Sequence, residues 1–533
     1  MTTRKITYIF FHVALLFCFS TMARTPQEKC GTIEVLKAMA DESDEITREF
    51  LDYKRITRPS MAYQYDTPSG HFRIHYDTTG YHAVDSIEYV HQMGEYLDYC
   101  WALYIDTLGY LAPPSDSTMG GSSNYDIYLK NISSYGLTWP GSDGPQPWLD
   151  YTSYIEIHNT FSTAYPNDDP EGPVAGAMKI TCAHEFHHAI QFGMRGDNTV
   201  WMAELTSVSM EDRVYPMVND YVWLIDYFTE SPNLPIDYSA GYHMYGLGIL
   251  PQYWHRIYGD DFLFSVWDTM IHETDFDALE IISQNYGTNL GIQLARFGVY
   301  AALIGSINTG FFSDGAAFED MFIDQIHSSY PASGEPDFPP YGYGLSYVLF
   351  QDFGSESHDL YIEFDGEDGI DWEVYAGKVV GDSVELFECY IGDFGEGAVQ
   401  VPSIQDAYLC LLSIVPTGNT SSTYDFTYEA RLVACDLTEV DRPEIYSMRV
   451  SPNPFNCSCQ IDIKANSLAR NESLEIYDIG GRKIAELKLE NSGENSYRAT
   501  WNGEDSSGKP VSSGIYFAGT PFTQDFIRLV LLK

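Results

Sequence analysis

The sequence is poor in basic residues, and beyond its first 23 residues it has no long apolar run. Its 533 residues include 29 Lys and Arg against 76 Asp and Glu, so the formal net charge at pH 7 is −47. A surface of this kind repels the phosphate groups of nucleic acids and anionic lipids, so no nucleic-acid partner is expected. No later stretch reaches the ~18 uninterrupted apolar residues that a transmembrane helix needs. We therefore expect no insertion into a membrane.

Cysteine is also used sparingly. The nine cysteines are scattered along the chain, and no two of them form a CxxC pair. This spacing argues against a zinc ribbon, and the length of the chain argues against a small domain built on disulfides. An even number of cysteines remains if the first 23 residues are removed, which permits disulfides in an oxidising compartment without fixing their pairing.

The first 23 residues have the pattern of a signal peptide. Arg4 and Lys5 precede an apolar run over residues 6–19, and small residues around Ala23 form a cleavage site. A positive start, a short apolar run and a small-residue site are the three parts of a secretory signal. The sequence therefore predicts a secreted protein whose mature chain begins near Arg24.

Residues 24–338 have the pattern of an α+β domain. Alternating apolar residues predict strands over 70–76, 125–132 and 151–161, with a loop rich in Gly, Pro and Ser between the last two. Helical periodicity covers residues 83–110 and most of the chain from Trp201 to Ser329.

The rest of the chain reads as all-β. A Pro- and Gly-rich stretch closes the helical pattern near residue 338, and short strands at short intervals over 339–436 predict an accessory β-sandwich. A linker over 437–446 leads to a last module, 447–533, in which two alternating runs around Gly480 and Gly481 predict a β-hairpin.

The motif HEFHH, His184 to His188, holds three of the fourteen histidines. Residues four apart on a helix lie one turn above each other, so His184 and His188 can present two imidazoles to one metal ion. Glu185 then faces the substrate side, where it can act as a general base. His187 lies near the same face. Gln191 is either an ordinary polar residue of the helix or a support for a ligand through a hydrogen bond.

A catalytic zinc site takes a third protein ligand and leaves a fourth position open. Glu204, in the segment WMAELTSV, follows His188 by sixteen residues and would reach the metal from a second helix packed on the first. Glu211, one or two turns further along the expected helix, is the rival third ligand.

At these residues the chain resembles the glutamate-zincin clan of metallopeptidases. The resemblance is closest to a secreted bacterial group with HE[FY]xHAIQ followed by WxxE, and it covers about residues 70–270. It implies that His184, His188 and Glu204 hold zinc. The family typically has an aromatic residue at the position of His187, which implies that His187 is not a ligand. The family usually has Gly after the third ligand, where this chain has Leu205. Tyr245 matches the family's Tyr-Gly position and is the implied donor to the oxyanion, with Tyr242 and His243 as alternatives.

The last module resembles the immunoglobulin-like sorting domain of the type IX secretion pathway of Gram-negative bacteria. The matching segments are SPNPFN, LEIYDIGGRKI, WNGEDSSGKPVSSGIYF and the ending RLVLLK, in that order. The resemblance implies export to the medium or the cell surface, with the secretion machinery as a partner.

The sequence thus predicts a secreted zinc metalloendopeptidase acting on protein or peptide substrates. The rival hypothesis is a surface adhesin or glycan-binding protein built on an inert zincin scaffold. Either protein would have an α+β domain followed by two all-β sandwich domains.

Overall fold

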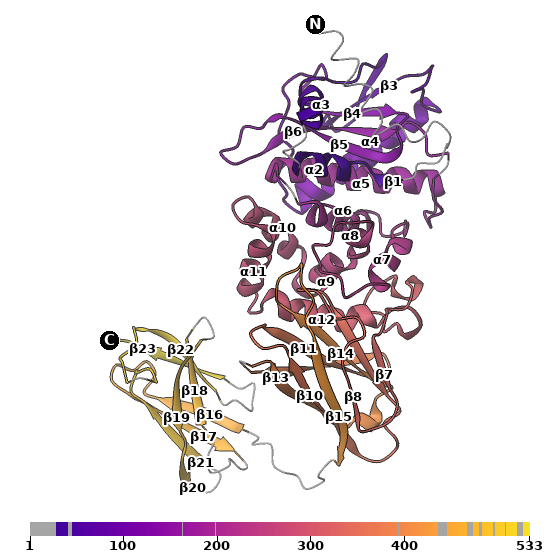
Figure 1. Ribbon diagram of the computed structural model, residues 1–533. Coiled ribbons are helices and arrows are strands. Elements are labelled where there is room, and N and C mark those ends of the chain that lie inside the picture. Colours follow the sequence, from indigo (N-terminus) through magenta and orange to yellow (C-terminus); the bar gives the residue numbers. More distant parts are fainter. Residues whose placement is uncertain are drawn as a thin grey trace. The chain divides into compact units, whose positions relative to one another are not determined.

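The computed structural model describes residues 28–40, 45–162, 164–197, 199–392, 394–434, 445–465, 473–478, 482–493, 496–506, 508–519 and 526–533. They divide into two compact units, Met1–Val433 and Ala434–Lys533 (Figure 1). The predicted signal peptide lies outside the described residues. Within the described ranges, no helix is both long enough and apolar enough to cross a membrane, and the seven cysteines found there are free thiols.

The first layer of the larger unit is a mixed six-stranded sheet with the order β1-β5-β6-β4-β3-β2. Its strands are β1 (Glu28–Cys30), β2 (Tyr63–Asp66), β3 (Phe72–Tyr76), β4 (Tyr125–Lys130), β5 (Ser134–Asp143) and β6 (Tyr151–His158). Strands β3, β4 and β6 are parallel, β5 is antiparallel to β6, and β1 is parallel to β5. The strands predicted over 70–76, 125–132 and 151–161 are confirmed as β3, β4 and β6.

The prediction of a loop between β4 and β6 is wrong, because that segment contains strand β5. Its Pro140 lies where the register with β6 shifts, between Pro140 and Asp143, and such irregularities are where a strand tolerates proline. Gly136 has a different role. A Cβ atom added there would lie 2.4 Å from Cγ of Glu185. Glycine therefore lets the backbone of β5 approach the neighbouring helix closely.

That helix is α5 (Pro173–Met194), which carries HEFHH. Proline at its first turn suits helix initiation, and every residue from Ala175 to Met194 is buried. It lies between the sheet, where it contacts β5 and β6, and α6 (Val200–Val214) (Figure 1). A helix with no solvent-facing side must satisfy its polar side chains internally, which explains the dense hydrogen bonding around it.

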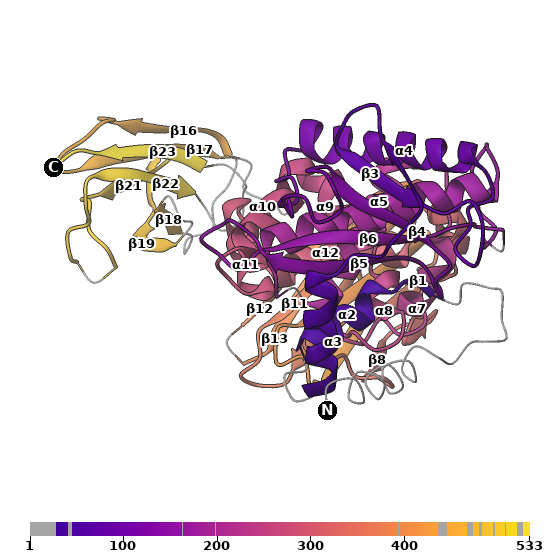
Figure 2. The ribbon, with the colours of Figure 1, turned by 90° about the horizontal axis from the view of Figure 1, so that it is seen from above.

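Three other helices lie against these elements. α4 (Ile87–Trp101) runs beside α5 (Figure 2), and it continues as a π-helical turn, Ala102–Thr107, that ends before Gly109 at φ +81°. It confirms the helix predicted over 83–110. α2 (Thr32–Ala40) and α3 (Glu45–Ile56) pack on β5.

The chain from residue 200 to residue 302 is mostly helical, as predicted, but the prediction of helix up to Ser329 is wrong. Residues 303–329 contain only short 3₁₀ turns and the strand Gln325–His327, with Gly305 and Gly310 at positive φ. After α6 come α7 (Asp226–Thr229), α8 (His243–Gly246), α9 (Ile249–Tyr258), α10 (Asp260–Met270), α11 (Asp275–Asn285) and α12 (Leu290–Ala302).

A nine-stranded sheet follows, with the order β7-β9-β14-β11-β12-β13-β10-β15-β8. The strands are β7 (Gln325–His327), β8 (Ala332–Gly334), β9 (Ser346–Gln351), β10 (His358–Gly366), β11 (Trp372–Val380), β12 (Ser383–Ile391), β13 (Glu396–Val401), β14 (Leu409–Pro416) and β15 (Phe426–Ala434). One face encloses its own apolar core, to which Phe350, Trp372 and Phe426 contribute.

The other face of this sheet packs on the helices. Tyr347, Tyr375 and Leu411, from β9, β11 and β14, belong to the same apolar core as residues of α12 such as Phe297. The sequence places a boundary at residue 338, yet β7 and β8 precede it and both sides of it lie in one compact unit.

The smaller unit is a sandwich of two antiparallel sheets, β16-β17-β21-β20 and β19-β18-β22-β23. The strands are β16 (Ile445–Ser451), β17 (Cys459–Ala465), β18 (Ser473–Asp478), β19 (Lys483–Lys488), β20 (Glu490–Gly493), β21 (Ser496–Trp501), β22 (Gly514–Gly519) and β23 (Phe526–Leu531). Trp501 packs between Phe455 and Tyr516 in its core. The predicted hairpin is confirmed by the pairing of β18 with β19, although Gly480 and Gly481 lie outside the described residues. The expected order, an α+β part followed by β-rich parts, is therefore observed.

Candidate metal centre

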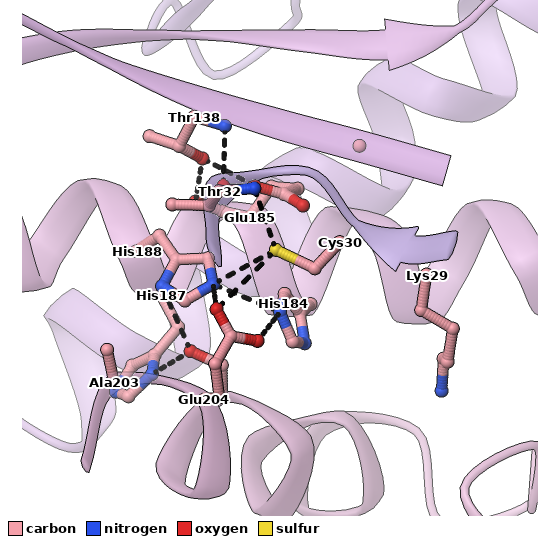
Figure 3. A network of polar contacts seen from close by, with 12 residues as sticks. Lys29, Cys30, Thr32, Thr138, His184, Glu185, His187, His188, Ala203 and Glu204 are labelled. Atoms are coloured by element: carbon pink, nitrogen blue, oxygen red, sulfur yellow. Dashed lines mark hydrogen bonds and ion pairs between the residues drawn. The ribbon is translucent and has the colours of Figure 1, made fainter. Parts of the chain in front are cut away.

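The helical spacing of HEFHH brings His184 and His188 together. Their Nε2 atoms are 3.0 Å apart. Helix α6, packed on α5, adds the carboxylate of Glu204, whose Oε2 lies 3.3 Å from His184 Nε2 and whose Oε1 lies 3.2 Å from His188 Nε2. All three side chains are buried. The three predicted ligand residues thus converge on one point (Figure 3).

A fourth donor, which sequence reasoning missed, comes from strand β1. Sγ of Cys30 lies 3.4 Å from His188 Nε2 and 3.7 Å from Glu204 Oε1. One ligand atom from each of Cys30, His184, His188 and Glu204 lies within 4.8 Å of all the others. The protein therefore contains a buried Cys/His/Glu cluster that could bind a metal ion. Cys30 stands 158 residues from His188, and no motif in the sequence links the two.

The donor distances fit a small tetrahedral ion. Bonds of 2.0–2.3 Å to nitrogen, oxygen and sulfur give a tetrahedron whose edges are about 3.3–3.8 Å. The observed separations, from 3.0 Å between the two imidazole Nε2 atoms to 3.7 Å between the Cys30 sulfur and a Glu204 oxygen, fall close to that range. The four side chains come from three different elements, so only the fold brings them together.

Both imidazoles are oriented by a hydrogen bond on the opposite ring nitrogen. His184 Nδ1 donates to Oε1 of Glu211 at 2.8 Å, and His188 Nδ1 donates to Oε1 of Gln191 at 2.7 Å. Such bonds fix the ring orientation and the tautomer of metal-binding histidines. Glu211, the rival third ligand, therefore lies behind His184 rather than among the four donors. Of the two alternatives for Gln191, the contact with His188 is the supporting one.

His187 takes no part in the cluster. Its Nδ1 accepts hydrogen bonds from Ser207 Oγ at 3.0 Å and Gln191 Nε2 at 2.9 Å, and its ring packs near Tyr104 and Trp267. Burial, and then the neighbouring histidines, hold the pKa of His187 well below its ordinary value. It is a neutral core residue in this structure.

Glu185 is buried beside the cluster and is held by two hydroxyl groups. Its Oε2 accepts from Thr138 Oγ1 at 2.7 Å and from Thr32 Oγ1 at 3.0 Å. Its Oε1 has no hydrogen-bond partner among the described residues. A buried carboxylate oxygen without a donor is costly unless the site receives one, such as water or substrate.

Of the three candidate oxyanion donors, Tyr245 lies nearest the cluster. Its ring centroid is 6.4 Å from that of His184, and burial together with the neighbouring Glu204 raises the pKa of its hydroxyl well above the ordinary value. His243 instead contacts the carbonyl oxygen of Tyr227 through Nδ1 at 3.1 Å. The Tyr242 ring packs against Tyr245, with 5.6 Å between the ring centroids.

The electrostatics of the cluster favour a cation at its centre. Burial opposes charging of the His188 imidazole, yet Glu204 and Cys30 raise its pKa to about 10. Burial likewise opposes ionisation of Glu204, but the two histidines hold its pKa well below the ordinary value. The buried anionic groups therefore stabilise positive charge, which protons or a metal ion can supply.

Comparisons with known proteins do not identify this chain. No family model matches, and no curated protein matches. Three solved structures are weakly similar. A DUF4785 family protein from Legionella pneumophila has 8% identity and a TM-score of 0.14, and the match covers 38% of this chain and 63% of that one. The adhesin domain of Epf from Streptococcus pyogenes (10% identity, TM-score 0.13) is matched over 38% of this chain and 73% of that one, and a β-glucuronidase from Bifidobacterium dentium (10% identity, TM-score 0.13) over 35% and 38%. The chain thus covers less than two thirds of the first and third. At these TM-scores none of them assigns a fold or a function.

The geometry predicts how individual substitutions change metal binding. His184→Ala, His188→Ala and Glu204→Ala should each raise the Kd for zinc by ~10²-fold or more, because one ligand accounts for roughly a quarter of the binding free energy of a structural zinc ion. Glu211→Gln keeps a hydrogen-bond acceptor behind His184 and should raise the Kd less, by about tenfold. Competition with a chromophoric chelator measures these constants.

His187→Phe is the control, and should keep one metal ion per chain. If Glu204→Ala binds zinc as tightly as the unmodified chain while Glu211→Gln releases it, the assignment of the third donor is wrong.

Proposed function

We propose that this protein is a zinc metalloendopeptidase of the glutamate-zincin type. The observation that carries the proposal is the meeting of HExxH and Glu204, from two helices, at one buried point with Glu185 beside it. In this assignment His184, His188 and Glu204 hold zinc, and Glu185 is the general base. The resemblance of HEFHHAIQ and WMAE to secreted zincins supports the same assignment.

The donor set supports zinc over other common cations. Imidazole nitrogen, carboxylate oxygen and thiol sulfur together suit zinc, whereas calcium and magnesium require mainly oxygen ligands. When bound here, zinc would polarise a substrate carbonyl and lower the pKa of a water molecule.

Glu185 would carry out the proton transfer of hydrolysis. As water oxygen adds to the carbonyl carbon, the carboxylate takes the water's proton. It then passes that proton to the amide nitrogen, the C–N bond breaks, and a carboxylate and an amine leave. Hydrogen bonds from Thr138 and Thr32 to Oε2 leave Oε1 free for this exchange.

Tyr245 is proposed as the donor that stabilises negative charge on the carbonyl oxygen. Its hydroxyl belongs to α8, which packs on α6 and so reaches the cluster from the side opposite the sheet. A neutral phenol can donate to an oxyanion, and the raised pKa of Tyr245 keeps it neutral.

For the smaller unit we propose a role in export. It folds around its own apolar core, apart from the unit that holds the cluster. Its resemblance to type IX sorting domains supports secretion to the medium or cell surface of a Gram-negative bacterium. The substrates would then be proteins or peptides met outside the cell.

The test of catalysis uses chains in which Cys30 is replaced by Ala, because a catalytic zinc site needs an open fourth position. In this background Glu185→Gln should keep zinc and lower casein hydrolysis by at least ~10³-fold, since the amide cannot accept a proton. Glu88→Gln, an exposed residue in the first turn of α4, is the control. Zinc-loaded protein that cleaves neither casein nor peptides would favour the inert-scaffold hypothesis instead.

Tyr245→Phe, in the same background, should lower kcat by ~10²-fold with zinc content unchanged, because an oxyanion donor acts mainly in the transition state. Tyr253→Phe removes another buried phenol, one that packs on Phe297 away from the cluster, and should leave kcat unaltered. An unchanged kcat for Tyr245→Phe would return the role to Tyr242 or His243.

Ending the chain after Asp441 should keep zinc binding and trap the protein in the periplasm of its natural host. Fractionation and immunoblotting measure its location, and the full chain is the control. Normal appearance of the shortened chain outside the cell would refute the sorting role.

A further inference from the structure

The segment of residues 28–32 occupies the candidate site in three ways at once. It places a sulfur among the metal donors, lies along a strand edge beside them and binds the proposed general base (Figure 3). Each of these contacts alone is common in folded proteins. Together they cover the groups that a substrate would have to reach.

The sulfur of Cys30 completes a set of four protein donors. Structural zinc sites are closed by four protein ligands, whereas catalytic sites keep one position open for water or substrate. His184, His188 and Glu204 are the three ligands that the proposed chemistry requires. The fourth position, where water would sit, is the one that Cys30 occupies, 3.4 Å from His188 Nε2.

The backbone of the segment covers the edge of β5. Strand β1 pairs with β5 in parallel, with Cys30 opposite Gly136, and Gly31 N–H donates to the Gly136 carbonyl at 2.9 Å. Gly136 is also the residue packed against Glu185. Exposed strand edges bind extended peptides through main-chain hydrogen bonds, so this edge is the place for an extended peptide substrate. β1 already fills it.

Thr32 and Lys29 anchor the segment on either side of the sulfur. Thr32 donates to Oε2 of Glu185 at 3.0 Å, and its Oγ1 accepts from the backbone N–H of Thr138 at 2.8 Å. The buried ammonium of Lys29 pairs with Asp220 and, at 2.8 Å, with Oε2 of Glu211. Because Glu211 also holds His184, the anchor is tied to the metal donors themselves.

We propose that residues 28–32 are a built-in inhibitor, in which Cys30 is the fourth metal ligand and the backbone occupies the substrate's place on β5. The proposal rests on the proposed peptidase function. It makes the full chain a latent enzyme whose site opens when the segment is withdrawn, for example by cleavage of the chain. Water then replaces the sulfur, and a peptide can pair with β5.

The first test asks whether Cys30 is a ligand, independently of activity. In full-length protein loaded with Co²⁺, a cysteine ligand gives an intense thiolate-to-metal charge-transfer band in the near ultraviolet. We expect the band in the unmodified chain and in Cys457→Ala, an exposed cysteine of the smaller unit. It should vanish in Cys30→Ala with one Co²⁺ per chain retained. A band absent from the unmodified chain, or unchanged in Cys30→Ala, would overturn the proposal.

The second test asks whether the segment inhibits. If the closed state outnumbers the open one by about 100 to 1, removing the sulfur can raise the rate by up to ~100-fold. We expect kcat/KM on a fluorogenic peptide to rise at least ~10-fold in zinc-loaded Cys30→Ala, with Cys457→Ala unchanged. Equal rates in Cys30→Ala and the unmodified chain, or loss of zinc from Cys30→Ala without a gain in rate, would show that Cys30 is not an inhibitory ligand.

A second variant acts through the backbone and leaves the sulfur in place. A Cβ added at Gly31 would lie 2.9 Å from Ser134 Oγ and 3.4 Å from the Gly136 carbonyl oxygen, so Gly31→Val should push the segment off β5 and also raise the rate. The proposal would be overturned if both variants bind zinc and cleave peptide but neither has a higher kcat/KM than the unmodified chain. If neither cleaves any peptide although the cobalt band is lost in Cys30→Ala, the peptidase function fails while Cys30 remains a ligand.

Discussion

The structure depends above all on the packing of α5 against α6. α5 is buried on every side, so its imidazoles and the carboxylate of Glu185 lie away from water and need partners inside the protein. α6 supplies Glu204 to the two Nε2 atoms and Glu211 to the rear of His184. The same helix pair thus places negative charge where a cation would be stabilised. It also arranges the donor atoms that could bind a metal ion.

The neighbouring elements of the larger unit pack on α5 or on α6 and hold these two helices in place. The sheet contacts α5 through β5 and β6, and Gly136 sets how close the strand can come. On the other side, α8 brings Tyr245 toward the cluster through α6. The groups proposed for ligand binding, proton transfer and oxyanion stabilisation therefore come from separate layers. Their relative placement is a property of the whole unit.

The sequence predicts the residues of the site that lie close together in the chain, and few of the others. His184, Glu185 and His188 follow from helical spacing, and Glu204 follows from a second helix close behind. Spacing alone left Glu204 and Glu211 as rivals, because only coordinates separate a donor facing the cluster from one behind it. Cys30 could not be predicted, since its contact depends on a three-residue strand pairing with β5. The sequence also predicts a loop where strand β5 forms, because the Gly and Pro residues of this strand are tolerated only through a register shift and a close helix contact.

The apolar core that α12 shares with β9, β11 and β14 has a consequence for how the protein is made. A ribosome or a translocation channel releases the chain from its N-terminus, and domains generally fold as units once their residues have emerged. Helix α12 cannot finish its packing until β14, which ends at Pro416, is available. The core shared by α12 and this sheet is therefore completed late in biosynthesis, long after HEFHH has left the exit tunnel.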